Sequence, residues 1–335
     1  MKKERQSTYE LLRILAILLI VMMHGIRSAY SSTNLINEFS FNVVNTIGNM
    51  GVTTFMLISG FFGIKFKASK LILLWGTVLI YSILIGIATY IMHPITELKP
   101  LLKFIYETLT PVSSNTWWFM TSYIIIYCLS PFVNKLISVM TQRQLLMLIG
   151  TLSVFYILFP TFLLHSVSYT AGGKSTVNLL LIYFIGRYLA LYGLPDFFRK
   201  HVAAIVPFCA LVIFYIDMFV IGKFFMCKDH NLLIVVGAIS LFTLFGRIQF
   251  TSAVVNKLAQ FVFPLYLMNM FLLNELEFQY LGRIQDASYM PYYLLTQAEI
   301  VAIAFAVAWL LQPLCARLLG PLMRYADKHF QPMQL

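Results

Sequence analysis

Long apolar runs, separated by short polar breaks, make up most of the chain from Leu11 onward. A run of about 20 apolar residues can cross a hydrocarbon core about 30 Å thick, and a helix satisfies its own backbone hydrogen bonds there. The pattern predicts an all-α polytopic membrane protein, with residues 1–335 forming a single integral-membrane domain. We expect about ten transmembrane helices, over residues 9–28, 43–63, 70–92, 117–137, 144–164, 176–193, 202–222, 231–247, 257–274 and 298–319.

The composition supports this fold class. Of the 335 residues, 60% are hydrophobic and 11% are charged, whereas a soluble globular chain carries about 25% charged residues. The basic segment Met1 to Arg5 and the apolar run after it could be a secretory signal peptide. However, Arg13 interrupts the run and no small-residue cleavage site follows it. We therefore expect this run to be the first transmembrane helix.

The Lys and Arg residues between these helices predict the orientation, because positive charge accumulates in short cytoplasmic loops. Fifteen fall on one side, namely Lys2, Lys3, Arg5, Lys65, Lys67, Lys70, Lys135, Arg143, Arg199, Lys200, Arg247, Lys257, Arg317, Arg324 and Lys328. Seven fall on the other side, namely Arg27, Lys99, Lys103, Lys174, Lys223, Lys228 and Arg283. Both termini are therefore predicted to be cytoplasmic. The net charge of +11 is scattered rather than laid along one face, so no nucleic-acid partner is expected.

Two ionisable side chains, Arg13 and His24, lie within the first predicted helix. Their spacing of eleven residues places them on one helical face, about 16 Å apart along the axis. One interpretation is that Arg13 extends to the cytoplasmic headgroups and His24 makes a polar contact at the outer interface. The alternative is catalytic, because a neutral imidazole in a polar cavity can remove a proton from a hydroxyl near pH 7.

The predicted cytoplasmic loop after the second helix carries Lys65, Lys67 and Lys70. These lysines either anchor the loop to anionic lipid or bind a polyphosphate such as that of coenzyme A. Arg187 lies near the same face and is a further candidate for the acyl-CoA site, although it too could extend to the headgroups. No Walker-type or Gly-x-Gly-x-x-Gly loop indicates a nucleoside triphosphate.

Aromatic and amide side chains gather toward the opposite side of the predicted membrane. Trp117, Trp118 and Tyr123 either belong to the interfacial aromatic belt or form a platform on which a sugar stacks. Polar residues inside the spans usually form interhelical hydrogen bonds. The alternative candidates for acceptor binding are Asn45, Asn49, Ser59 and Asn269. The four cysteines are too far apart to indicate a metal site, and no metal ion is expected.

Four segments, in order, resemble the bacterial membrane acyltransferase-3 family. They are Tyr9-Glu10-Leu11-Leu12-Arg13-Ile14-Leu15-Ala16 continuing to His24, residues 51–62, Trp117-Trp118-Phe119 continuing through Tyr123 to Ser130-Pro131-Phe132, and Phe263-Pro264-Leu265-Tyr266-Leu267-Met268-Asn269. The resemblance is greatest to the polysaccharide and capsule O-acetyltransferase branch. It implies a ten-helix enzyme of the bacterial cytoplasmic membrane that moves an acyl group, here expected to be acetyl, from acetyl-CoA to a hydroxyl of a cell-surface or lipid-linked glycan.

The resemblance also implies roles for single residues. His24 matches the catalytic histidine and Arg13 its partner arginine, while Lys67 and Lys70 match a basic pair associated with the acyl donor, with lysine in place of arginine. Asn269 stands where relatives often have a histidine, and the helix that begins near Trp118 lacks the glutamate found in lipopolysaccharide-modifying relatives. The alternative functions are a glycan transporter or flippase, and a non-catalytic component of a polysaccharide-synthesis complex.

Overall fold

The computed structural model describes residues 6–28, 35–163, 168–221, 226–284 and 289–330. Within these ranges all regular structure is helical. The helices are α1 (Ser7–Ser28), α2 (Leu35–Phe62), α3 (Ala68–Met92), α4 (Leu98–Leu109), α5 (Trp118–Val139), α6 (Gln142–Ser153), α7 (Phe159–Phe162), α8 (Thr176–Tyr192), α9 (Asp196–Phe219), α10 (Leu232–Phe245), α11 (Ala253–Leu258), α12 (Val262–Ile284) and α13 (Tyr289–His329). A π-helical turn η1 (Val154–Leu158) joins α6 to α7, and two 3-10 turns are η2 (Ser168–Gly173) and η3 (Ala259–Phe261).

The predicted all-α membrane fold is confirmed. Six helical segments of the described chain are long and apolar enough to cross a membrane, namely Ser7–Gly25, Ala68–Met92, Trp118–Val139, Gln142–Phe162, Asp196–Asp217 and Pro291–His329. Two shorter apolar helices are α8 and α10. The two remaining predicted spans correspond to α2 and α12. The number of crossings, about ten, therefore stays a prediction.

One helix lies where the sequence predicts a connection. α4 falls inside residues 93–116 and is 12 residues long, which is too short to cross a bilayer. It packs on α3, where the Ser82 hydroxyl donates to the carbonyl oxygen of Thr108 at 2.8 Å. Pro94 precedes this helix and Pro111 follows it, so the two prolines flank a helix and not a continuous loop. Its apolar residues recur at helical spacing, namely Leu98, Leu101, Leu102, Ile105 and Leu109.

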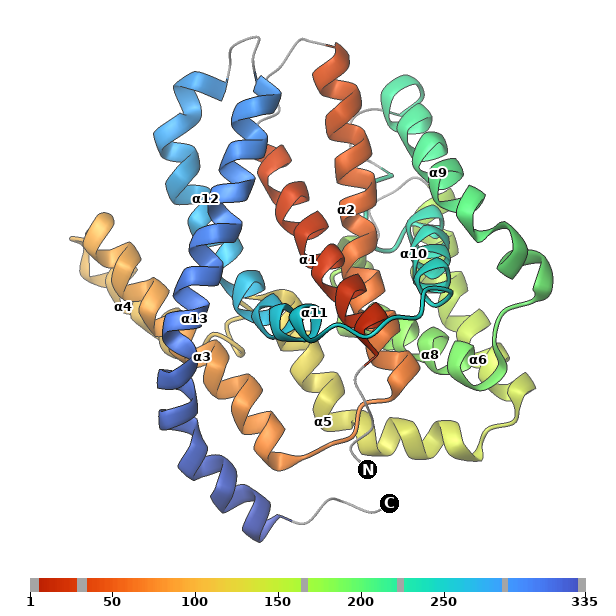
Figure 1. The fold of residues 1–335 in the computed structure, drawn as a ribbon, viewed down its shortest axis with the longest axis horizontal. Coiled ribbons are helices and arrows are strands. Elements are labelled where there is room, and N and C mark those ends of the chain that lie inside the picture. The colour runs from red at the N-terminus through yellow and green to blue at the C-terminus, as the bar shows by residue number, and fades with distance from the viewer. Residues whose placement is uncertain (1–5, 29–34, 164–167, 222–225, 285–288, 331–335) are drawn as a thin grey trace.

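Two helices extend well beyond their predicted limits. α2 begins at Leu35 rather than near residue 43, and α13 continues from Tyr289 to His329 rather than ending near residue 319. α13 is 41 residues long and contains Pro313 and Pro321. Its C-terminal end therefore projects past the bundle, on the lower side in Figure 1.

The helices α1 and α2 lie at the centre of the bundle (Figure 1). They pack closely because α2 has glycine where it meets α1: a Cβ on Gly51 would lie 2.8 Å from the carbonyl oxygen of Ala16. The other end of α2 approaches α8 in the same way, since a Cβ on Gly60 would lie 2.4 Å from the carbonyl oxygen of Tyr183. Small residues allow helix backbones to approach in a membrane. They place α1 and α2 close enough to share the cavities described below.

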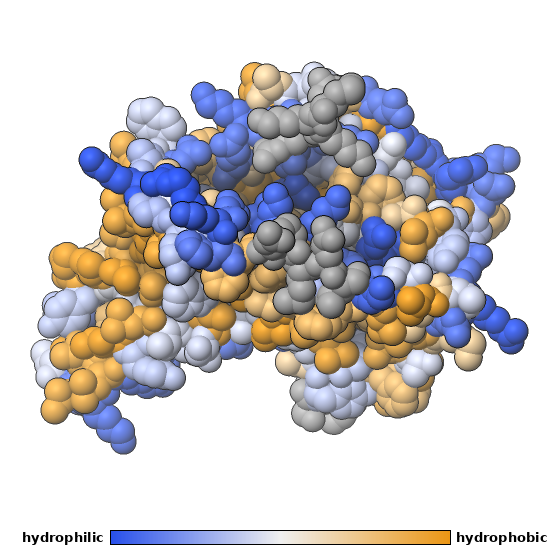
Figure 2. Space-filling model, turned by 90° about the horizontal axis from the view of Figure 1, so that it is seen from below, coloured by the Kyte–Doolittle hydropathy of each residue, from blue (hydrophilic) through white to orange (hydrophobic). Residues whose placement is uncertain are grey.

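The beginning of α1, the end of α13 and the connection between α2 and α3 all lie toward the lower side in Figure 1. Seen from this side, hydrophilic residues gather over the middle and upper part of the face, and hydrophobic residues lie along its left and lower edges (Figure 2). This arrangement agrees with the predicted common side for both termini. Some of the charges behind that prediction lie outside the described residues, namely Lys2, Lys3, Arg5 and Lys223, together with the side chains of Arg27 and Arg283.

Candidate active site

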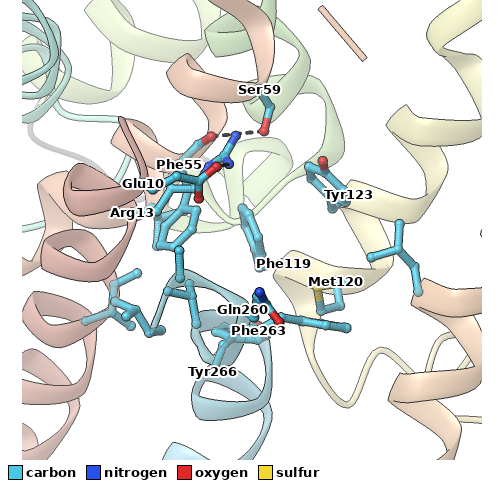
Figure 3. A pocket seen from close by; sticks show the side chains of 16 residues that line it. Glu10, Arg13, Phe55, Ser59, Phe119, Met120, Tyr123, Gln260, Phe263 and Tyr266 are labelled. Atoms are coloured by element: carbon cyan, nitrogen blue, oxygen red, sulfur yellow. Dashed lines mark hydrogen bonds and ion pairs between the residues drawn. The ribbon is translucent and has the colours of Figure 1, made fainter. Parts of the chain in front are cut away.

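A cavity of about 340 Å³ lies between α1, α2, α3, α5, η3 and α12, toward the side that carries the α2–α3 connection. We call it the inner cavity. Most of its lining is apolar, and Figure 3 shows the ring of Phe119 extending between the charged pair of α1 and the α12 residues Phe263 and Tyr266. Its polar side chains are Glu10, Arg13, Ser59, Tyr123, Gln260 and Tyr266.

Arg13 forms an ion pair inside this cavity. Its Nη1 atom lies 2.9 Å from Oε1 of Glu10, one helical turn earlier on α1. The Arg13 side chain is 31% exposed and the Glu10 side chain 13%. Both charges are partly buried, and the ion pair compensates each for the water that it loses. The spacing of three residues on one helix is a signal from which the sequence could have predicted Glu10.

The three predicted donor-binding lysines are exposed. Lys65 and Lys67 lie on the connection between α2 and α3, and Lys70 lies in the first turn of α3; we call this segment, residues 63–70, the lysine connection. Backbone bonds hold this connection: the Tyr127 hydroxyl accepts from the Lys67 amide at 3.0 Å, and the Asn134 side chain donates to the Ile64 carbonyl at 2.8 Å. The helices on either side run directly into the inner cavity, because Ser59 precedes Lys65 by six residues and Leu74 follows Lys70 by four. Lys70 therefore lies about 6 Å along the axis of α3 from Leu74, which lines the cavity.

Arg187 does not line the inner cavity. Its Nη1 atom donates to the carbonyl oxygen of Phe61 at 3.2 Å. The guanidinium also packs against Gly63, which has a φ of +70°, and a Cβ there would lie 3.1 Å from Nη1. Arg187 thus fixes the end of α2 beside the lysine connection. Its predicted role in acyl-CoA binding stays a prediction.

A second cavity, of about 480 Å³, lies on the other side of the bundle and is called the outer cavity. It brings together five residues singled out from the sequence, namely His24, Asn49, Trp117, Trp118 and Asn269. Asn45 lies behind this group, where its carbonyl oxygen accepts from the Asn49 amide at 2.7 Å.

Two predicted acceptor-binding residues lie elsewhere. Ser59 and Tyr123 line the inner cavity, away from the group around His24. Ser59 is ten residues beyond Asn49 on α2, which is about 15 Å along the helix. Tyr123 is likewise five residues beyond Trp118 on α5. Ser59 and Tyr123 therefore lie nearer the opposite side of the membrane from Asn49 and Trp118. For this reason they do not line the cavity that holds most of the other predicted acceptor-binding residues.

The His24 ring contacts Asn269 of α12. The distance from His24 Nδ1 to Asn269 Oδ1 is 2.8 Å. Asn269 is 1% exposed. Neighbouring segments hold the turns around both residues. The Tyr293 hydroxyl of α13 donates to the Met22 carbonyl, and Nε1 of Trp117, the residue before α5, donates to the Leu267 carbonyl at 3.2 Å. The imidazole is thus presented to the outer cavity from a fixed position.

Four residues line both cavities and form the wall between them: Ile20, Val52, Phe119 and Tyr266. The Phe119 ring lies 5.7 Å from that of Tyr266 and 5.9 Å from that of Tyr123, measured between ring centroids. The shared face of Arg13 and His24 on α1 is not polar throughout, because Ile17 and Ile20 lie between them on that face and line the inner cavity.

Two connections add charged residues that the sequence did not single out as site residues. Lys174 follows η2 and Asp229 precedes α10, and both line the outer cavity. The backbones of the two connections are in close contact at Gly173, where φ is +91°. A Cβ at this position would lie 2.5 Å from the His230 amide nitrogen. Burial of His230, with Lys228 nearby, lowers the pKa of its imidazole to about 4. His230 is therefore neutral at pH 7.

Comparison with known proteins identifies the chemistry of this fold. A family model described as an acyltransferase domain matches residues 7–312, a range that includes every residue of both cavities. Neither a curated protein nor a solved structure matches the chain. The match favours acyl transfer over the transporter and scaffold alternatives. The chain belongs to the acyltransferase-3 family, and it is a multi-pass membrane acyltransferase.

Proposed function

We propose that the protein is an O-acetyltransferase of the bacterial cytoplasmic membrane. It takes the acetyl group of cytoplasmic acetyl-CoA and transfers it to a hydroxyl of a cell-surface or lipid-linked glycan. The observation that carries this proposal is the pair of cavities that meet at one wall, with Arg13 in the inner cavity and His24 in the outer cavity. A donor and an acceptor on opposite sides of a membrane require such a pair.

The inner cavity suits the donor. The phosphates of acetyl-CoA would bind near Lys65, Lys67 and Lys70, because lysine attracts phosphate as a point charge. The pantetheine arm would then extend past Ser59 and Leu74 into a cavity whose lining is largely apolar. Arg13 lies about three helical turns from His24, so we assign it to the donor rather than to direct contact with the imidazole.

The outer cavity suits a saccharide. Trp117 and Trp118 offer flat apolar surfaces on which the apolar face of a sugar ring can stack. Asn49 and the charged residues Lys174 and Asp229 line the same cavity and can bond to sugar hydroxyls. His24 lies among these groups, where it can remove the proton of a bound hydroxyl.

The reaction breaks the thioester C–S bond and forms an ester C–O bond. His24 takes the hydroxyl proton, and the coenzyme A thiolate leaves on the inner side, where it takes up a proton. His24 acts either as the general base for direct attack or as a transient acyl acceptor. In both routes the wall of Ile20, Val52, Phe119 and Tyr266 must part for the acetyl group to reach the outer cavity, where it meets either the acceptor hydroxyl or His24. Phe119 extends into the inner cavity (Figure 3) and is the residue best placed to move.

The test is acetyl transfer by the purified full chain from radiolabelled acetyl-CoA to the lipid-linked saccharide fraction of the source cells. Wild type should label the saccharide, and His24→Gln should lower kcat by at least about 100-fold, in line with the usual contribution of a general base. Coenzyme A binding should be retained in His24→Gln, because His24 lies outside the inner cavity. Wild type that neither binds coenzyme A nor consumes acetyl-CoA would contradict the proposal and favour a transport function.

A further inference from the structure

The contact between His24 and Asn269 gives the asparagine a role other than binding the acceptor. We propose that Asn269 is a positioning residue that fixes the tautomer and the ring orientation of His24. The inference rests on the proposed function, because it concerns how His24 acts as a base. It also gives a role to the asparagine that stands where relatives often have a histidine.

The orientation of the Asn269 amide follows from its two contacts. Its Nδ2 atom donates to the backbone carbonyl oxygen of Tyr266, and its Oδ1 atom faces His24 Nδ1 at 2.8 Å. Rotating the amide by half a turn would place Oδ1 against the Tyr266 carbonyl, where two acceptors would oppose each other. The backbone of α12 therefore determines which amide atom meets the imidazole.

This orientation determines the tautomer of His24. An amide oxygen only accepts hydrogen bonds, so the proton of the neutral ring must lie on Nδ1. Nε2 then carries the lone pair, and Nε2 is the atom that takes the hydroxyl proton. When the ring becomes an imidazolium, both nitrogens carry protons and the Nδ1 bond to Asn269 is retained and strengthened. Asn269 thus supports the base before and after proton transfer without touching the substrate.

The contact is rigid enough to act in this way. Asn269 is buried, and the two helices that carry the pair are each tied to a neighbour one turn or less away, α1 at Met22 and α12 at Leu267. A supporting residue locked by packing keeps a catalytic group within the narrow range of productive orientations. Asn269 also lines the outer cavity, yet its amide oxygen contacts His24 and its amide nitrogen donates to the Tyr266 carbonyl.

The test compares three variants of the full chain in the acetyl-transfer assay, with the same saccharide fraction as the acceptor. Asn269→Leu keeps the side-chain size but cannot accept from Nδ1, and kcat should fall by about 10- to 100-fold, the usual loss for a supporting residue. The KM for acetyl-CoA should stay within about twofold, because the donor cavity is not altered. Asn269→His, which offers a ring nitrogen as acceptor, should restore part of kcat.

Asn269→Asp separates positioning from a merely structural role. A carboxylate accepts the same bond and also stabilises the protonated ring, so the acid limb of kcat/KM against pH should move to higher pH by about one unit or more. Lys174, Asp229 and Tyr266, the other titratable groups that line the cavity, are unchanged in this variant. The matched control is Asn256→Asp on α11, which lines neither cavity and should leave the acid limb in place.

Two results would overturn the inference. One is an acid limb that does not move in Asn269→Asp while the variant folds and binds coenzyme A. The other is an Asn269→Leu variant that keeps kcat and raises only the KM for the acceptor, which would make Asn269 a binding residue. Failure of the proposed function gives a different result, because wild type itself would then transfer no acetyl group.

Discussion

Arg13 and His24 lie on one face of α1 and yet line different cavities, with Ile20 in the wall between them. The family signature contains both residues, and we assign Arg13 to the acyl donor and His24 to the acceptor. On this account Arg13 acts on the donor side and His24 on the acceptor side, and substitutions at the two positions should affect different kinetic constants.

The ion pair of the inner cavity can be tested through its carboxylate. Glu10→Gln removes the partner that orients Arg13 at 2.9 Å, and the KM for acetyl-CoA should rise by about three- to tenfold, with the KM for the saccharide unchanged. Glu107→Gln on α4 is the matched control, because Glu107 pairs with Lys103 at 3.8 Å in a more exposed setting. Equal changes in the two variants would contradict a role for Glu10 in donor binding.

The lysine connection should bind coenzyme A largely through charge. Replacing Lys67 and Lys70 together with glutamine should weaken coenzyme A binding by about tenfold in titration calorimetry and should reduce its dependence on salt. The control replaces Lys99 and Lys103 of α4, which are exposed on the predicted outer side. Loss of affinity in the control but not in the Lys67 and Lys70 variant would show that the donor binds elsewhere.

The wall should keep water away from the thioester. Phe119→Ala opens space between the two cavities, so acetyl-CoA hydrolysis without an acceptor should increase by about threefold or more. Phe155→Ala is the control, because that ring is exposed on η1 and lines neither cavity. Hydrolysis that stays at the wild-type rate in Phe119→Ala would mean that this side chain does not seal the wall.

Buried His230, in the connection before α10, should make the free energy of unfolding depend on pH. Burial lowers the pKa of His230 to about 4, against an ordinary value of about 6.5. The unfolded chain therefore binds more protons between these two values, and stability falls as the pH drops through this window. From pH 7.5 to pH 5.0 the loss is about 2 kcal/mol.

His230→Gln removes this proton uptake. Thermal unfolding of the purified protein at pH 7.5 and 5.0 should show a smaller difference in melting temperature for the variant than for wild type. The same difference in both proteins would assign the pH dependence to other groups.

The sequence predicted most of the fold because apolar runs long enough to cross a bilayer have few alternatives to a helix. It did not predict α4, since the prolines that bound this helix also mark loops. Of the residues singled out from the sequence, His24, Asn49, Trp117, Trp118 and Asn269 line the outer cavity, whereas Ser59 and Tyr123 line the inner cavity.

The rest of the site depends on how helices pack against each other. That Phe119 and Tyr266 meet, and that they close a wall with Ile20 and Val52, follows from contacts between α1, α2, α5 and α12 that no local pattern reveals. Lys174 and Asp229 reach the outer cavity from connections, where hydrophobic periodicity carries no information. The direct contact of Asn269 with His24 is likewise a tertiary feature.

Delivery of acetyl across the membrane is the central claim, and reconstituted vesicles test it most directly. The saccharide fraction is sealed inside, radiolabelled acetyl-CoA is added outside, and coenzyme A inside the vesicles is measured as a check on leakage. Molecules whose lysine connection faces outward should label the saccharide inside while coenzyme A stays outside, and His24→Gln should abolish this labelling. Labelling that occurs only when donor and acceptor share one compartment would contradict the account.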